Sequence, residues 1–186
     1  MTIQHKLITN ADLHEPKGVS AAANKTVYVA NGSGSGAWTA PNAVANVYIA
    51  FNSSSPGYTQ ANTTSDVILD PTWVSGVISD FTVQTSPNAR LRYDGTDTKN
   101  VNITLAIACN QASGSNKNVE FALFKNGTEI TGSRSIRTTT TSDWGNITVV
   151  GSTTMATNDY IEIKSKTSAS ATIQYASLSL RVLGAV

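Results

Sequence analysis

The sequence predicts an all-β protein: an antiparallel jelly-roll β-sandwich preceded by an extended N-terminal arm. Only 13% of the 186 residues are charged, and serine, threonine and asparagine are the common polar residues. These side chains suit exposed strand faces and turns and lower helix propensity. From residue 45 onward, short alternations of apolar and polar residues are separated by turn residues. No apolar pattern with helical spacing persists in that part of the chain.

The chain changes in composition near Pro41, which divides it into an arm with a glycine-rich neck (residues 1–42) and a head (residues 43–186). Apolar residues in the arm are scattered and too few to form a core of their own. A single helical turn capped by Asn10 and ended by Pro16 is the regular structure expected early in the arm. The arm is therefore expected to be either disordered or ordered only by packing against another surface.

Three glycines, Gly32, Gly34 and Gly36, alternate in the neck. A phosphate-binding loop would need a lysine followed by serine or threonine, and a dinucleotide fingerprint would need a following helix. Neither is present after Gly36. We instead expect a small hairpin in which Val27–Ala30 pairs with residues 37–39, with a turn at residues 31–32.

The head contains a succession of strand-like segments. In order along the chain they are residues 45–51, 65–70, 79–84, 89–97, 101–109, 118–130, 144–150, 158–166 and 171–184. This many short strands with frequent turn signals is typical of a sandwich or barrel.

Two dipeptides in these segments predict hairpin turns, Asp94-Gly95 and Asn126-Gly127. In the last segment the apolar residues change parity along the strand. A β-bulge near residues 176–177 would bring both sets onto one core face.

The single cysteine, Cys109, continues the apolar face of residues 101–109. One cysteine cannot form a disulfide within the chain, and a thiolate zinc site needs more ligands. We expect Cys109 to be a small buried apolar residue rather than a reactive thiol.

The residues do not predict an enzyme, a metal site or a cofactor. Both histidines, His5 and His14, lie in the arm, and "HEPKG" lacks the second histidine of a zinc-protease helix. A calcium loop is disfavoured because its Asp-x-Asp-x-Asp spacing is absent. No particular carboxylate pair is favoured for glycoside cleavage among the candidates Asp94, Asp97, Glu120 and Glu162.

Charge and hydropathy also exclude several partners. The net charge of +1 predicts neither nucleic-acid nor anionic-membrane binding. No segment approaches the roughly 20 apolar residues of a membrane-spanning helix, and no signal peptide is expected at the N-terminus. We therefore expect synthesis in a cytoplasm.

The segment "LHEPKGVSAAANKTVYVANGSGSGAW" (residues 13–38) resembles a linker of tailed-phage virion proteins. The stretches "ARLRYDGT", "VEFALFKNGTEI", "TNDYIEI" and "YASLSLRVLG" resemble the jelly-roll head of phage decoration and fibre proteins, which is similar to the trimeric tumour-necrosis-factor-like fold. The resemblance implies a homotrimer in which an N-terminal arm attaches and a β head projects.

The resemblance also implies where contacts lie. The arm would bury apolar side chains against the major capsid protein, at Ile3, Leu7, Ile8, Leu13 and Val19. Aromatic residues on strand faces opposite the core would pack around the threefold axis. The candidates are Tyr93, Phe124, Tyr160 and Tyr175, with ordinary core positions as the alternative for each.

The function that these observations favour is that of a non-enzymatic capsid decoration (cement) protein on the virion surface. The alternative is a tail-fibre or spike head that binds host-surface glycans through Tyr58, Trp73 and Trp144. A glycan-cleaving enzyme is the least favoured of the three.

Overall fold

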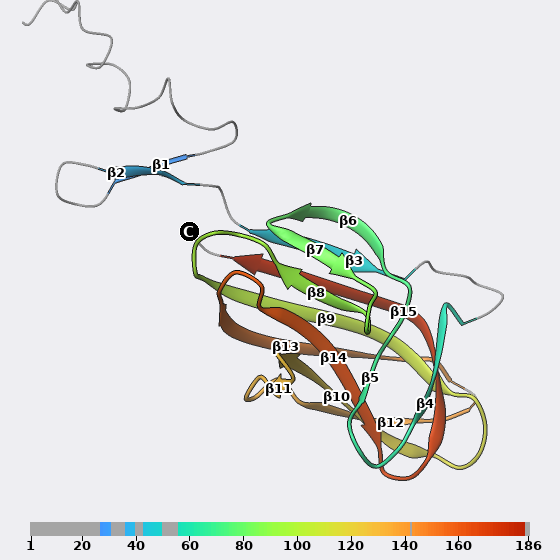
Figure 1. The fold of residues 1–186 in the computed structure, drawn as a ribbon. Helices are drawn as coiled ribbons and strands as arrows, with labels where there is room; N and C mark the ends of the chain where they lie inside the picture. The colour runs from blue at the N-terminus through green and yellow to red at the C-terminus, as the bar shows by residue number, and fades with distance from the viewer. Residues whose placement is uncertain (1–26, 31–35, 40–42, 50–55, 142, 185–186) are drawn as a thin grey trace, which may run out of the picture. The chain divides into compact units, whose positions relative to one another are not determined.

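The computed structural model describes residues 27–30, 36–39, 43–49, 56–141 and 143–184 (Figure 1). The chain divides into two compact units, Met1–Pro41 with Val186, and Asn42–Ala185. In the described residues the regular secondary structure consists of fifteen strands, β1 to β15, without a helix. The all-β prediction is confirmed, whereas the role of residues 1–42 as an attachment arm stays a prediction.

The first unit contains the expected hairpin. Strand β1 (Val27–Ala30) pairs antiparallel with β2 (Gly36–Thr39), and Tyr28 lies opposite Trp38. Their rings meet edge to face with centroids 5.4 Å apart, a cross-strand aromatic pair that stabilises a two-stranded ribbon. The turn predicted at residues 31–32 and the helical turn near Asn10 lie outside the described residues.

The second unit is a sandwich of two antiparallel sheets (Figure 1). The six-stranded sheet has the order β13-β9-β15-β3-β6, with β4 also paired to β15. Its strands are β3 (Val44–Tyr48), β4 (Tyr58–Asn62), β6 (Val74–Ser79), β9 (Lys99–Gln111), β13 (Gly145–Met155) and β15 (Ala171–Gly184).

The seven-stranded sheet has the order β11-β10-β14-β8-β7, with β12 paired to β10 and β5 paired to β14. Its strands are β5 (Val67–Ile68), β7 (Phe81–Gln84), β8 (Arg90–Tyr93), β10 (Lys117–Lys125), β11 (Thr128–Glu129), β12 (Ser135–Thr139) and β14 (Tyr160–Thr167).

Strand β9 shows how the alternating sequence builds the core. It pairs with β13 along one side and with β15 along the other. Its apolar residues, from Val101 to Cys109 at every second position, are buried against the opposite sheet, while Asn102 and Thr104 point outward. Residues from both sheets join one buried apolar cluster. The predicted faces of this strand, including the buried Cys109, are confirmed.

Strand β15 contains the predicted bulge. Its register against β9 shifts between Tyr175 and Ser177. The extra residue lets Tyr175 before the shift and Leu178 after it both point into the core, where both are fully buried. The change of apolar parity in the sequence therefore corresponds to a β-bulge in this strand.

The Asn126-Gly127 hairpin is also confirmed. It joins β10 to β11, with Lys125 opposite Thr128. The φ angles of Asn126 and Gly127 are 50° and 80°, and two consecutive positive values are what a tight two-residue hairpin turn requires.

The hairpin predicted at Asp94-Gly95 is wrong. Strand β8 belongs to the seven-stranded sheet and β9 to the six-stranded sheet, so the chain between them crosses from one sheet to the other. Gly95 serves a different purpose there, because any Cβ at this position would collide with the ring of Tyr93. The Tyr93 hydroxyl donates a hydrogen bond to the backbone carbonyl of Asp97, at 2.7 Å. The glycine therefore permits a close approach rather than a tight turn.

Asp159, in the stretch "TNDYIEI", connects two neighbouring turns. Its carboxylate accepts hydrogen bonds from the Asn126 amide at 2.6 Å and from the Ala156 backbone N–H at 2.9 Å. The Lys125 ammonium lies 3.1 Å from the same carboxylate. Burial acts to raise the pKa of Asp159, but these three partners outweigh it, and its pKa lies below the ordinary value.

This lowered pKa predicts a pH-dependent contribution to stability. A carboxylate with a depressed pKa stabilises the fold fully above its unfolded pKa and loses that contribution as the pH falls through its folded pKa. We expect Asp159→Asn to lower the free energy of unfolding by about 1–2 kcal/mol at pH 7 and to have little effect well below pH 3.8. Urea titrations from neutral to acidic pH measure this, with Asp143→Asn, an exposed aspartate, as the control. An effect of Asp159→Asn that is independent of pH would contradict the assignment.

Candidate functional site: the outer face of the six-stranded sheet

The outer face of the six-stranded sheet is almost free of charge. The strand register aligns its outward residues in rows across β3, β15, β9 and β13. The first row is Tyr48, Ser179, Ala106 and Thr148; the second is Asn46, Arg181, Thr104 and Val150; the third is Val44, Leu183, Asn102 and Ser152.

Three apolar side chains stand out from these rows. Val150 is 58% exposed, Tyr48 39% and Leu183 38%. The residues around them are small and uncharged, so they need not lose a strongly bound hydration shell when another surface covers them. Depletion of charge with a few larger apolar or aromatic side chains is the composition of an interface core.

Arg181 is the charged residue in the middle of this face. It is exposed and lies between Asn46 on β3 and Thr104 on β9. Within the described part of the chain, its guanidinium takes part in no ion pair. A second surface placed here would have to supply an acceptor for it.

The outer face of the seven-stranded sheet has the opposite character. Lys166 lies 3.2 Å from Glu120 on the neighbouring strand, and Arg90 stacks over the ring of Tyr160 at 4.4 Å. Lys164 covers the ring of Phe124, at 4.2 Å. Charged side chains here already have partners within the chain, as expected for a solvated face.

Arg134 extends this charged network. Its guanidinium lies 2.6 Å from Glu129, 2.9 Å from Asp66 and 3.2 Å from Glu120. Hydrogen bonds to Glu129 and then Asp66 raise its pKa above the ordinary value. These contacts tie the segment before β5 to β10 and β11, which is a structural role.

The four aromatic residues predicted at a trimer interface fall into two groups. Tyr93 and Tyr175 are fully buried in the sandwich core of a single chain, so their prediction as interface residues is wrong. Tyr93 packs against Phe81, and Tyr175 packs against Phe121. Both core positions agree with the strand pattern, because Tyr93 shares the buried face of Leu91 on β8 and the bulge in β15 keeps Tyr175 on the core face.

The other two, Phe124 and Tyr160, lie on the outer face of the seven-stranded sheet. Phe124 is buried under Lys164, and Tyr160 is half-buried under Arg90. Both rings are therefore already covered by cationic side chains of the same chain. Their participation in contacts between chains stays a prediction.

The structure does not bring the three predicted glycan-binding aromatics onto one surface. Tyr58 and Trp73 pack against the core as half-buried side chains. Burial raises the pKa of the Tyr58 hydroxyl, which accepts a hydrogen bond from the Asp70 N–H. Trp144 is exposed and precedes β13, separated from β4 by β9 and β15. A single aromatic platform built from these three residues is not formed.

The remaining sequence candidates are quickly placed. Ile3, Leu7, Ile8, Leu13 and Val19 lie outside the described residues, as do His5 and His14.

Burial raises the pKa of the Cys109 thiol to about 11, and this effect exceeds the opposing influence of Arg137, so the thiol is protonated at neutral pH. The described residues contain no cluster of three or more His, Cys, Asp or Glu side chains suited to a metal ion. They also contain no helix long and apolar enough to cross a membrane.

Sequence reasoning missed the outer face itself. Val150, Tyr48 and Leu183 were not singled out, although the alternation of β9 already placed uncharged residues opposite its core face. The signal that could have found the face is the shared absence of charge at alternate positions of several strands. It becomes visible once those strands are known to be neighbours.

No family model matches this chain, and no curated protein matches it. Several solved structures, however, are similar to it in fold. The structure of Eiger TNF from S. frugiperda aligns with a TM-score of 0.54 at 8% identity, covering 78% of this chain and 94% of that one. The fold is TNF-like. At this identity the likeness concerns the fold alone.

Two further solved structures are similar at lower scores. Murine APRIL at pH 8.5 aligns with a TM-score of 0.46 and 14% identity over 77% of this chain and 98% of that one. A CBM35 module from Cellvibrio japonicus Abf62 aligns with a TM-score of 0.31 and 15% identity, over 76% of this chain and 98% of that one.

Proposed function

We propose that this protein is a non-enzymatic virion structural protein: a capsid decoration protein whose TNF-like head forms a homotrimer. The head associates through the outer face of the six-stranded sheet, and residues 1–42 attach the trimer to the major capsid protein. The observation that carries the self-association is the contrast between the two outer faces of one sandwich. One face carries several charged side chains held by ion pairs or ring contacts within the chain, and the other is uncharged except for Arg181.

Two further observations support the proposal. The stretch of residues 13–38 resembles a linker of tailed-phage virion proteins, and the head has a TNF-like fold. Three copies of one arm on a single trimer would multiply weak attachments into a high avidity, because the second and third contacts become intramolecular. This suits a lattice that repeats the same binding site.

Light scattering coupled to size exclusion tests the self-association. We expect a particle of about three times the 19.5 kDa mass of one chain. Binding to purified capsids tests the attachment, and we expect deletion of residues 1–20 to abolish binding while the trimer persists. A stable monomer would overturn the trimer, and undiminished capsid binding without residues 1–20 would overturn the role of the arm.

A further inference from the structure

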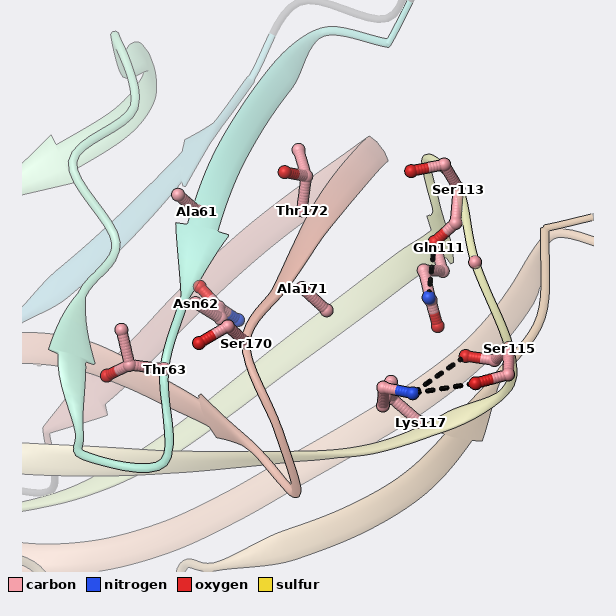
Figure 2. Close-up of a pocket in the computed structure, with 11 residues that line it drawn as sticks. Ala61, Asn62, Thr63, Gln111, Ser113, Ser115, Lys117, Ser170, Ala171 and Thr172 are labelled. Carbon is pink, nitrogen blue, oxygen red and sulfur yellow. Dashed lines mark hydrogen bonds between the residues drawn. The ribbon is translucent and has the colours of Figure 1, made fainter.

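One end of the sandwich contains a polar pocket. It lies where β4 ends, β9 ends and β15 begins, beside the loop that connects β9 to β10 (Figure 2). Its volume is about 670 Å³, within the range of pockets that hold small ligands. Asn62 and Gln111 lie on different sides of it, and Ser113, Ser115, Lys117 and Ser170 surround them (Figure 2).

Gln111 carries a buried oxygen without a partner. The side chain is 2% exposed, and its Nε2 donates to the backbone carbonyl of Ser113. A carbonyl only accepts hydrogen bonds, so the amide cannot be turned over, and Oε1 must face away from Ser113. Among the described residues this oxygen has no hydrogen-bond donor. A buried acceptor left unpaired is costly, and such groups are rare without a functional reason.

Asn62 is a second buried amide that lines the same pocket. It is 1% exposed, and its Nδ2 donates to the Ser165 hydroxyl at 3.0 Å. Its Oδ1 accepts no hydrogen bond within the described part of the chain. The hydroxyls of Ser165 and Tyr175 lie beside this amide and can donate to its oxygen, so Gln111 Oε1 is the acceptor in this pocket that calls for a donor from outside the protein.

The rim supplies the complementary groups. The Lys117 ammonium donates to the Ser115 carbonyl at 3.3 Å and to the Ser115 hydroxyl at 2.8 Å, which orders the loop between β9 and β10 (Figure 2). The hydroxyls of Ser113 and Ser170 can donate or accept. The described lining contains no carboxylate, so it does not suit a metal cation.

These groups select a ligand chemistry. The Gln111 oxygen needs a donor, the Lys117 ammonium keeps one N–H beyond the two that Ser115 accepts, and the serine hydroxyls donate or accept. An alcohol group donates and accepts at once, so several neighbouring alcohols on one ligand satisfy the whole set. We propose that this pocket binds a saccharide unit, one of whose hydroxyl groups donates to Gln111 Oε1. This site is separate from the aromatic residues considered earlier and is independent of the proposed trimer and capsid attachment.

Saturation-transfer NMR with the full chain tests the pocket, using D-glucose, D-galactose, N-acetyl-D-glucosamine and D-glucuronate as probes. We expect transfer to at least one of these sugars and a dissociation constant from titration calorimetry. Gln111→Leu removes the orphaned acceptor at similar size and should weaken binding about tenfold or more. Ser170→Trp should block the pocket from its exposed rim, where folding is not at risk.

Ala169→Trp is the matched control, because it adds the same ring to an exposed position of the same turn outside the pocket lining. It should leave binding unchanged. Absence of transfer to all four sugars would overturn the proposal. So would binding that survives both Gln111→Leu and Ser170→Trp, since the sugar would then occupy another place. Sizing of the same variants reads out the trimer separately.

Discussion

Val150→Lys is expected to convert the proposed trimer into a monomer. Val150 stands on the uncharged face of the six-stranded sheet, in the same row as Arg181. A lysine here adds a second positive charge to a face on which the described strands carry no acidic side chain. Each subunit interface would then have to bury an unpaired ammonium near a guanidinium. Breaking an interface in this way costs several kcal/mol, about 3–5 kcal/mol for a buried charge without a partner.

Ile136→Lys is the matched control for this experiment. Ile136 is 61% exposed, close to the 58% of Val150, and lies on the outer face of the seven-stranded sheet. It is directly opposite Glu120 in the register, so a lysine there gains an acidic neighbour. Light scattering should give the trimer mass for Ile136→Lys and the monomer mass for Val150→Lys, with similar melting of the sandwich in both. If Ile136→Lys lost the trimer and Val150→Lys kept it, the interface would lie on the seven-stranded sheet, which would contradict the proposal.

Gly95→Ala is expected to destabilise the sandwich by about 2–3 kcal/mol, the scale of overpacking in a rigid core. The new methyl group would overlap the ring of Tyr93. That ring cannot move aside easily, because it is fully buried, packs on Phe81 with centroids 5.2 Å apart, and is held by its hydrogen bond to Asp97. Chemical denaturation measures the change in the free energy of unfolding.

Gly132→Ala separates this clash from the general effect of replacing a glycine. Gly132 has a φ of 80°, and a Cβ there meets nothing within 4 Å, so its substitution costs backbone strain alone, about 1 kcal/mol. Tyr93→Leu should relieve the overlap, so that the double variant with Gly95→Ala is less destabilised than the sum of the two single changes. Strict additivity would show that Gly95 acts through something other than Tyr93.

Several features of the fold could be predicted because they are local. Period-two alternation assigned the two faces of β9, and the change of parity located the bulge between Tyr175 and Ser177. The need for two positive φ angles identified the Asn126-Gly127 turn. Each of these signals lies within a few consecutive residues, so the local sequence is enough to predict the turn or the strand face.

A local rule failed at Asp94-Gly95, where the partner of a strand decides the outcome. Asp94-Gly95 has the composition of a hairpin turn, yet β8 and β9 pair with different sheets. The interface positions of Tyr93 and Tyr175 were implied by the resemblance rather than by alternation, and both side chains lie in the core of one chain. The ring contact between Tyr175 and Phe121 joins strands that are far apart in the sequence, which no short stretch of sequence reveals as neighbours.

The sequence by itself determined that this chain is an all-β protein, with a core face on β9 and a hairpin at Asn126-Gly127, because alternation and turn geometry are encoded by adjacent residues. Only the tertiary structure decided which strands share a sheet. That pairing collects uncharged positions from four strands into one face and brings Asn62, Gln111 and Ser170 to one pocket. The physical reason is that long-range strand pairing, rather than local propensity, sets which side chains become neighbours.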